Sequence, residues 1–235
     1  MTGSDEIRRQ VIGHLQRLQA EGLGTLPRPP REPEGAACEV VAPAAPGLPQ
    51  ARTLEDLAQE SQSCTLCGLC EQRTKVVFGV GDPNARLMFI GEGPGRDEDL
   101  QGEPFVGAAG QLLNRILVAM GLRREDVYIA NTVKCRPPRN RNPEPAELAA
   151  CRPYLLEQVK LVAPEIIVVL GRVAMQAVLE TDAPLGRMRG RFHDWHGIPV
   201  ACTYHPAYLL RKPEDKGKTW TDMQAVMERL GLERR

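Results

Sequence analysis

The clearest pattern along the chain is an alternation of short apolar runs with longer amphipathic segments from about residue 53 to the C-terminus. Four runs are apolar at nearly every position: RLMFIG (86–91), VYIANTV (127–133), EIIVVLG (165–171) and PVACTYH (199–205). A strand that is covered on both faces of a sheet shows such continuous hydrophobicity, whereas a half-exposed strand alternates. The four runs therefore predict the central strands of a mostly parallel sheet.

The segments between and after these runs are of helical length, and they supply the other layers of the predicted fold. They read AAGQLLNRILVAMG (108–121), PAELAACRPYLLEQVKLV (145–162), GRVAMQAVL (171–179) and TWTDMQAVMERLG (219–231). Strands that alternate with helices are typical of α/β domains. We expect a three-layer α/β/α sandwich around a central, mostly parallel sheet of about four strands. Ligands of such sheets bind beyond the carboxyl ends of the strands.

The first 52 residues differ from the rest in pattern. Residues 1–22 predict an amphipathic helix that Ser4 can cap and whose apolar residues share one face. Residues 23–52 are rich in proline, alanine and glycine, which predicts a linker. We expect one domain over 53–235, and the apolar face of the N-terminal helix is a candidate for binding a protein partner.

Composition and charge narrow the class of protein only slightly. The chain has 30 basic and 30 acidic residues and is 42% hydrophobic, as ordinary globular proteins are. A nucleic-acid enzyme would therefore need its basic residues in local clusters. No stretch approaches the roughly 20 apolar residues of a membrane helix, and the N-terminus MTGSDEIRRQ lacks the apolar part of a signal peptide. We expect a monomer in the cytoplasm, with no membrane segment.

The cysteine spacing indicates a metal site. Cys64 and Cys67 form a C-x2-C pair, and Cys135 and Cys151 form a C-x15-C pair much further along the chain. In a reducing compartment such spacing favours metal binding over disulfides. Four cysteines hold 4Fe-4S clusters and structural zinc alike, so spacing alone leaves both open. Cys70 offers a fifth thiol, and one of the five is then spare.

Polar residues follow the predicted strands at the edge where a ligand would bind. The turn GEGPGRDED has neither the GxGxxG fingerprint nor a Walker lysine, so it supports nucleotide binding only weakly. Its glycines permit close backbone approach beside Glu92 and Glu98, as a pocket for a planar base requires. Asn131 carries both a donor and an acceptor and can read the edge of a pyrimidine. His205 ends the last strand.

Basic and apolar residues near these strand ends indicate contacts with DNA. His205 is followed by Leu209, Leu210 and Arg211, and apolar residues beside a cation suit a wedge into the base stack. Two basic clusters are expected to contact phosphates: Lys134, Arg136, Arg139 and Arg141 in one, and Arg187, Arg189 and Arg191 in the other.

Four motifs together, GEGPGRDED, PFVGAAGQLLNRIL, NTVKCRPPRNRNP and HPAYLLR, resemble the family 4 uracil-DNA glycosylases from about Cys64 to near the C-terminus. The resemblance implies a 4Fe-4S cluster held by Cys64, Cys67, Cys135 and Cys151, with Cys70 spare. It also implies a uracil pocket. Its residues would be Glu92, Gly93 and Pro94 of the first motif, Phe105 as the stacking ring, Asn131 as the base reader and His205 as the partner of the departing base.

The function expected from this resemblance is base excision repair of uracil-containing DNA. The enzyme would flip uracil out of the helix and hydrolyse its N-glycosidic bond, leaving an abasic site. His205 and Glu92 are the predicted catalytic residues, with Glu92 positioning the water, and Glu98 is predicted to exclude thymine by crowding its C5 position. The alternative is a non-catalytic, metal-stabilised DNA-binding module, which would need neither Asn131 nor His205.

Overall fold

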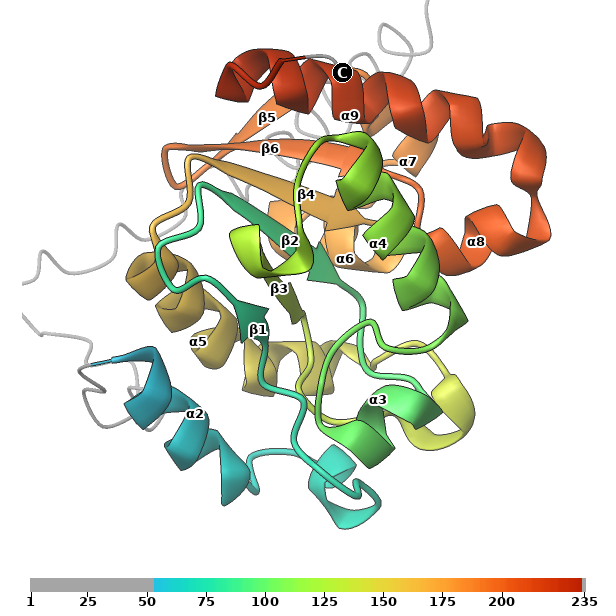
Figure 1. The fold of residues 1–235 in the computed structure, drawn as a ribbon. Coiled ribbons are helices and arrows are strands. Elements are labelled where there is room, and N and C mark those ends of the chain that lie inside the picture. The colour runs from blue at the N-terminus through green and yellow to red at the C-terminus, as the bar shows by residue number, and fades with distance from the viewer. Residues whose placement is uncertain (1–52, 234–235) are drawn as a thin grey trace, which may run out of the picture. The chain divides into compact units, whose positions relative to one another are not determined.

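A six-stranded sheet forms the centre of the molecule (Figure 1). The computed structural model describes residues 53–233, so the predicted helix 1–22 and linker 23–52 lie outside the described residues and stay predictions. The strand order is β1-β3-β2-β4-β6-β5. The four inner strands run parallel: β3 (Tyr128–Asn131), β2 (Leu87–Gly91), β4 (Ile166–Leu170) and β6 (Ile198–Thr203). They coincide with the four apolar runs, which confirms the mostly parallel sheet.

Two edge strands bring the total to six rather than the predicted four or so. β1 (Val80–Gly81) pairs with β3, and β5 (Phe192–Trp195) pairs with β6, both antiparallel. β1 is only two residues long, and β5 reads FHDW and is only partly buried. An edge strand is not enclosed on all sides, so it lacks the continuous hydrophobicity that marks the inner strands.

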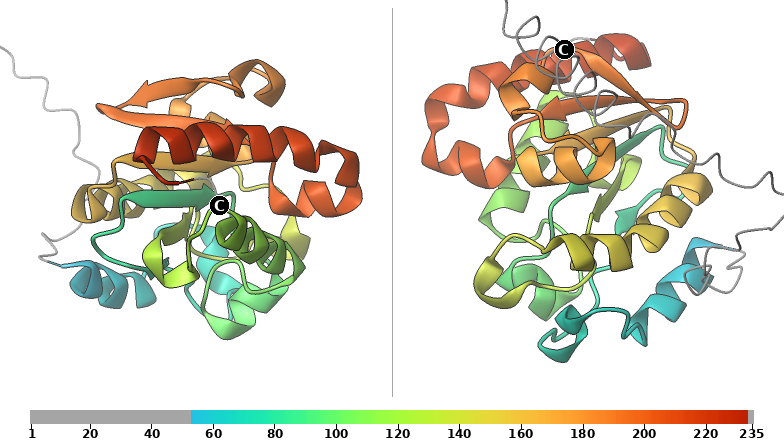
Figure 2. Two further views of the ribbon diagram at one scale, coloured as in Figure 1. Left: turned by 45° about the horizontal axis from the view of Figure 1, so that its top comes forward. Right: turned by 180° about the vertical axis from the view of Figure 1, so that it is seen from behind.

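Helices cover both faces of the sheet (Figures 1 and 2). α4 (Ala108–Ala119) and α9 (Lys216–Leu230) pack on one face. α2 (Leu54–Gln62), α5 (Pro145–Val162) and α6 (Arg172–Leu179) pack on the other. Alternate residues of β2 supply both cores: Leu87 and Phe89 on the first face, Met88 and Ile90 on the second. The three-layer α/β/α sandwich is confirmed.

Short helical elements follow the strands at the carboxyl edge of the sheet. They are α3 (Arg96–Gln101) after β2, the 3-10 helix η3 (Pro138–Asn140) after β3, and α8 (Pro206–Arg211) after β6. The remaining short elements are η1 (Gly68–Glu71), η2 (Arg124–Asp126), α7 (Leu185–Met188) and η4 (Pro213–Asp215). Because parallel strands end at one edge, three motifs meet there, which begin at or just after the ends of β2, β3 and β6: GEGPGRDED, NTVKCRPPRNRNP and HPAYLLR. Within residues 53–233, none of the helices has the length and apolar character needed to span a membrane.

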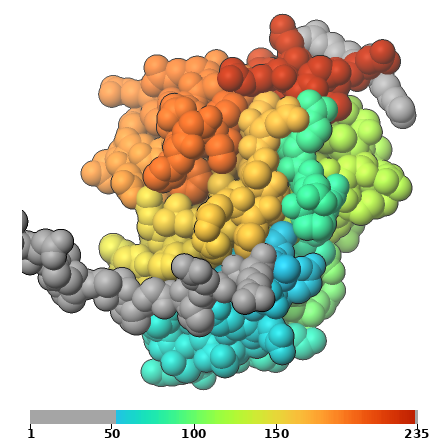
Figure 3. Space-filling model, turned by 90° about the vertical axis from the view of Figure 1, so that its left-hand side faces the viewer, coloured from blue at the N-terminus to red at the C-terminus, as the bar shows by residue number. Residues whose placement is uncertain are grey.

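The segment before β1 lies at one end of the domain, where α2 and the chain that follows it appear in blue and cyan (Figure 3). α2 begins with a capping box, in which Thr53 and Asp56 each accept the other's backbone N–H at 3.1 Å. Leu54 and Leu57 then pack in the same core as α5. This packing brings the C-x2-C segment beside α5, which carries Cys151.

Candidate active site

A cavity of ≈ 420 Å³ opens at the carboxyl edge of the sheet. Its volume is within the range of small-molecule sites. All the predicted substrate-binding residues line it: Glu92, Gly93, Pro94, Glu98, Phe105, Asn131 and His205. They come from the turn after β2, α3, the loop before α4, the end of β3 and the start of α8. The structure therefore brings together residues that lie more than 100 positions apart in the sequence.

Asn131 and Phe105 line this cavity, and both side chains lie against Gly91. A Cβ atom at Gly91 would lie 2.4 Å from Asn131 Oδ1 and 2.5 Å from the Phe105 ring, so only glycine leaves both side chains their space. Asn131 is 1% exposed, and within residues 53–233 no donor hydrogen-bonds to its Oδ1. A buried polar atom without a partner is unfavourable. The amide is therefore available to a polar ligand that enters the cavity.

Phe105 forms a wall of the cavity in a strained backbone conformation. Its φ is 54°, a left-handed value that is costly for a bulky residue. Glu98 Oε1 accepts the N–H groups of Val106 and Gly107 at 3.0 Å each, and Arg124 donates to the Phe105 carbonyl at 3.3 Å. These bonds fix the ring, whose centroid lies 5.6 Å from that of His205. The sequence did not reveal this loop-holding contact of Glu98.

His205 is a neutral imidazole whose tautomer is set by the helix that it caps. Its Nδ1 accepts the backbone N–H of Ala207 at 3.1 Å at the start of α8. Burial lowers the pKa of His205 to about 4, and the positive charge of Arg211 adds to this. With Nδ1 acting as an acceptor, the ring proton resides on Nε2. His205 therefore offers one N–H donor without carrying a charge.

The burial of His205 predicts a pH dependence of stability. Its pKa is about 4 when folded and roughly 6.5 when unfolded, so between these values the unfolded chain binds more protons. The free energy of unfolding should fall as the pH drops from 6.5 towards 4, by at most about 1.4 kcal/mol per pH unit from this group. Urea unfolding of the wild type and His205→Gln across this range checks it, and equal slopes would contradict it.

Glu92 lies half-buried at the end of β2. Burial raises the pKa of its carboxyl group, and the nearby positive charge of Arg172 opposes the rise. Its backbone carbonyl accepts hydrogen bonds from the hydroxyl of Thr132 and from the N–H of Val133, which tie the turn after β2 to β3. A carboxylate with a raised pKa is a stronger base than a solvated one.

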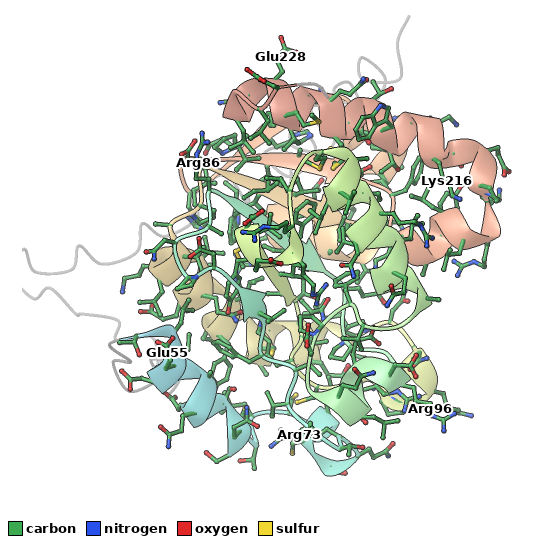
Figure 4. All side chains as sticks on the ribbon, in the orientation of Figure 1. Glu55, Arg73, Arg86, Arg96, Lys216 and Glu228 are labelled. Atoms are coloured by element: carbon green, nitrogen blue, oxygen red, sulfur yellow. The ribbon has the colours of Figure 1, made fainter. Side chains whose placement is uncertain are left out.

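The four predicted cysteine ligands and Cys70 line a second cavity at the α2 end of the domain. Arg73, labelled in Figure 4, donates to Cys135 Sγ at 3.3 Å, and the Lys134 N–H donates to Cys151 Sγ at 3.3 Å. Burial raises the pKa of Cys151 to about 11 and also raises the pKa of Cys135. Over residues 53–233, no three His, Cys, Asp or Glu side chains stand grouped as ligands of a metal ion.

The two predicted basic clusters only partly face solvent. Lys134 is 2% exposed and lies in the interior, so its prediction as a phosphate contact is wrong. Arg189 forms a buried ion pair with Asp222 at 2.7 Å and stacks on Tyr204, so it too is structural. Leu209 on α8 is 1% exposed, so its prediction as part of the wedge is wrong. Arg139 is exposed, and Leu210 is 41% exposed, next to Arg211, which lines the first cavity.

Comparison with known proteins agrees with this geometry. A family model described as the uracil DNA glycosylase superfamily matches residues 78–229. A type-4 uracil-DNA glycosylase of Archaeoglobus fulgidus is 43% identical over 187 residues, covering 76% of this chain and 94% of the relative. One of Thermotoga maritima is 47% identical over 160 residues, covering 67% of this chain and 83% of the relative.

The chain belongs to the uracil DNA glycosylase superfamily, since the family model spans most of the domain. Within the superfamily it groups with the type-4 uracil-DNA glycosylases, as the motifs predicted. It is therefore an enzyme of uracil excision in DNA repair, and it hydrolyses the N-glycosidic bond.

Proposed function

We propose that the cavity at the carboxyl edge of the sheet receives a uracil flipped out of DNA, and that Asn131 and His205 contact different polar groups of the base. The observation that carries this proposal is the buried Asn131 Oδ1 that lacks a donor among the described residues. The N3–H of uracil would satisfy this acceptor, and the amide nitrogen would donate to O4. Phe105 would stack on the base.

Excision leaves negative charge on the departing uracil, and His205 is placed to stabilise it. Its Nε2–H would donate to O2 as the charge develops, which is stabilisation directed at the transition state. Glu92, with its raised pKa, would position the attacking water. Gly93 and Pro94 would supply backbone contacts to the base. Glu98 keeps its predicted role of crowding C5 in addition to its bonds to the Phe105 loop.

DNA would approach the rim where α8 and the loop after β3 lie. Leu210 is exposed and can enter the space that the flipped base vacates, while Arg211 and Arg139 are placed for phosphate contacts.

The alternative, a non-catalytic DNA-binding module, does not require the buried amide of Asn131. Release of free uracil from an oligonucleotide supports the proposal, and tight binding without release would support the module.

We further propose that Cys64, Cys67, Cys135 and Cys151 hold a 4Fe-4S cluster. The N–H···S bonds from Arg73 and Lys134 fit thiolate ligands, and the four thiols line one cavity although they come from distant segments. A bound cluster would cross-link the segment after α2 to the loop after β3 and to α5. Binding would release the protons that burial keeps on the free thiols.

If the four cysteines hold a 4Fe-4S cluster, the purified protein should be brown and contain about four iron atoms per chain. Serine at any of the four ligand positions should bleach the colour and lower the melting temperature, because a ligand is lost. Cys70→Ser is the matched control and should do neither. Metal analysis and absorption spectra check this, and one zinc per chain without visible absorption would refute it.

A further inference from the structure

Lys134, the buried lysine of the NTVKC motif, lies outside the proposed site. Its ammonium group donates to the backbone carbonyl of Asn131 at 2.8 Å and to the side-chain oxygen of Gln158. Both acceptors are uncharged. A buried cation is costly unless its hydrogen bonds are satisfied and its charge is balanced. An apolar side chain at position 134 would be less costly to bury. The lysine, however, also holds the backbone carbonyl of Asn131.

The second side of Lys134 faces the cysteines. Its backbone N–H donates to Cys151 Sγ at 3.3 Å, and the residue lines the cysteine cavity. Thiolates that hold a cluster would place negative charge beside the ammonium group and offset its burial. Lys134 is thus in direct contact with both a cluster ligand and the base reader.

Further contacts join Lys134 to the segment before β1 and to α5. Its carbonyl accepts the N–H of Val77 at 2.8 Å. Gln158 on α5 donates in turn to the Phe78 carbonyl at 2.9 Å and to the Tyr128 hydroxyl at 3.1 Å. The carbonyl of Asn131 is thereby held against α5 and β3. A shift of about 1 Å in a positioning contact can cost roughly a hundredfold in rate.

We propose that Lys134 is a positioning residue for uracil recognition. Its ammonium group fixes the backbone carbonyl of Asn131, and its backbone N–H connects this segment to Cys151 in the cysteine cavity. This inference rests on the proposed role of Asn131. Lys134 does not touch the base itself.

A double-mutant cycle tests the proposal on the full chain with its iron bound. The variants are Lys134→Met, Asn131→Ala and the double variant, and Lys160→Met is the control at a 75% exposed lysine of α5. For each variant we would measure the single-turnover rate of uracil excision, the protein concentration that gives half the maximal rate, the iron content and the melting temperature. We expect Lys134→Met to keep its iron and to lose roughly 10- to 100-fold in excision rate. Lys160→Met should match the wild type.

The double variant shows whether Lys134 acts through Asn131 or only stabilises the fold. If Lys134 acts through Asn131, the double variant should be no slower than Asn131→Ala within about twofold. Multiplied losses would overturn the proposal. If Lys134→Met loses its iron, Lys134→Gln, which keeps a side-chain donor, replaces it in the cycle, and iron loss in both would show a purely structural role. A normal rate for Asn131→Ala would refute the reading role itself, and the inference with it.

Discussion

Replacing His205 by alanine is expected to slow uracil excision by roughly 100- to 1000-fold, the loss seen when one preorganised donor to a developing oxyanion is removed. The reason is the fixed tautomer: Nδ1 caps α8, so Nε2–H is the donor, and burial keeps the ring neutral. A neutral donor becomes effective as charge builds on O2. Single-turnover rates on a uracil-containing oligonucleotide measure the effect.

The control for this variant is His196→Asn. His196 is exposed and has a φ of 53°, a value that asparagine adopts readily. It should excise uracil at the wild-type rate. Equal losses in the two variants would mean that the effect does not come from the cavity.

Gly91→Ala is expected to lower excision by about a hundredfold while the domain stays folded. The added Cβ would lie 2.4 Å from Asn131 Oδ1 and 2.5 Å from the Phe105 ring, so one of them must move. Both are predicted to hold the base, and both are fixed by surrounding bonds. The excision rate should fall, and the half-saturating enzyme concentration should rise.

The matched control for the glycine is Gly186→Ala in α7. A Cβ atom there meets nothing within 4 Å, so excision and melting temperature should stay unchanged. A Gly91→Ala protein that excises uracil at the wild-type rate would contradict the placement of the base between Asn131 and Phe105.

The inner part of the fold was predictable from sequence, because a buried strand and an amphipathic helix carry their pattern locally. The four inner strands follow the four apolar runs, and α5 spans the predicted 145–162. The edge strands were missed because two residues, or a half-exposed FHDW, carry too little pattern. The short helices α3 and α8 were missed for the same reason.

The site was predictable in its members but not in its contacts. The predicted pocket residues follow motifs and strand ends, and they do line one cavity. Lys134 was assigned to a solvated basic loop because its partner Gln158 lies 24 positions away. Arg189 was misassigned likewise, since Asp222 lies 33 positions away. Burial by distant partners leaves no local pattern in the sequence.

The central claim is that His205 acts on the charge of the departing base and contributes little to DNA binding. Measuring the single-turnover rate and the DNA dissociation constant on the same His205→Ala protein tests it most directly. The mechanism predicts a rate reduced by roughly 100- to 1000-fold with a nearly unchanged dissociation constant. A near-normal rate with weakened DNA binding would make His205 a DNA contact and would contradict the mechanism at its central step.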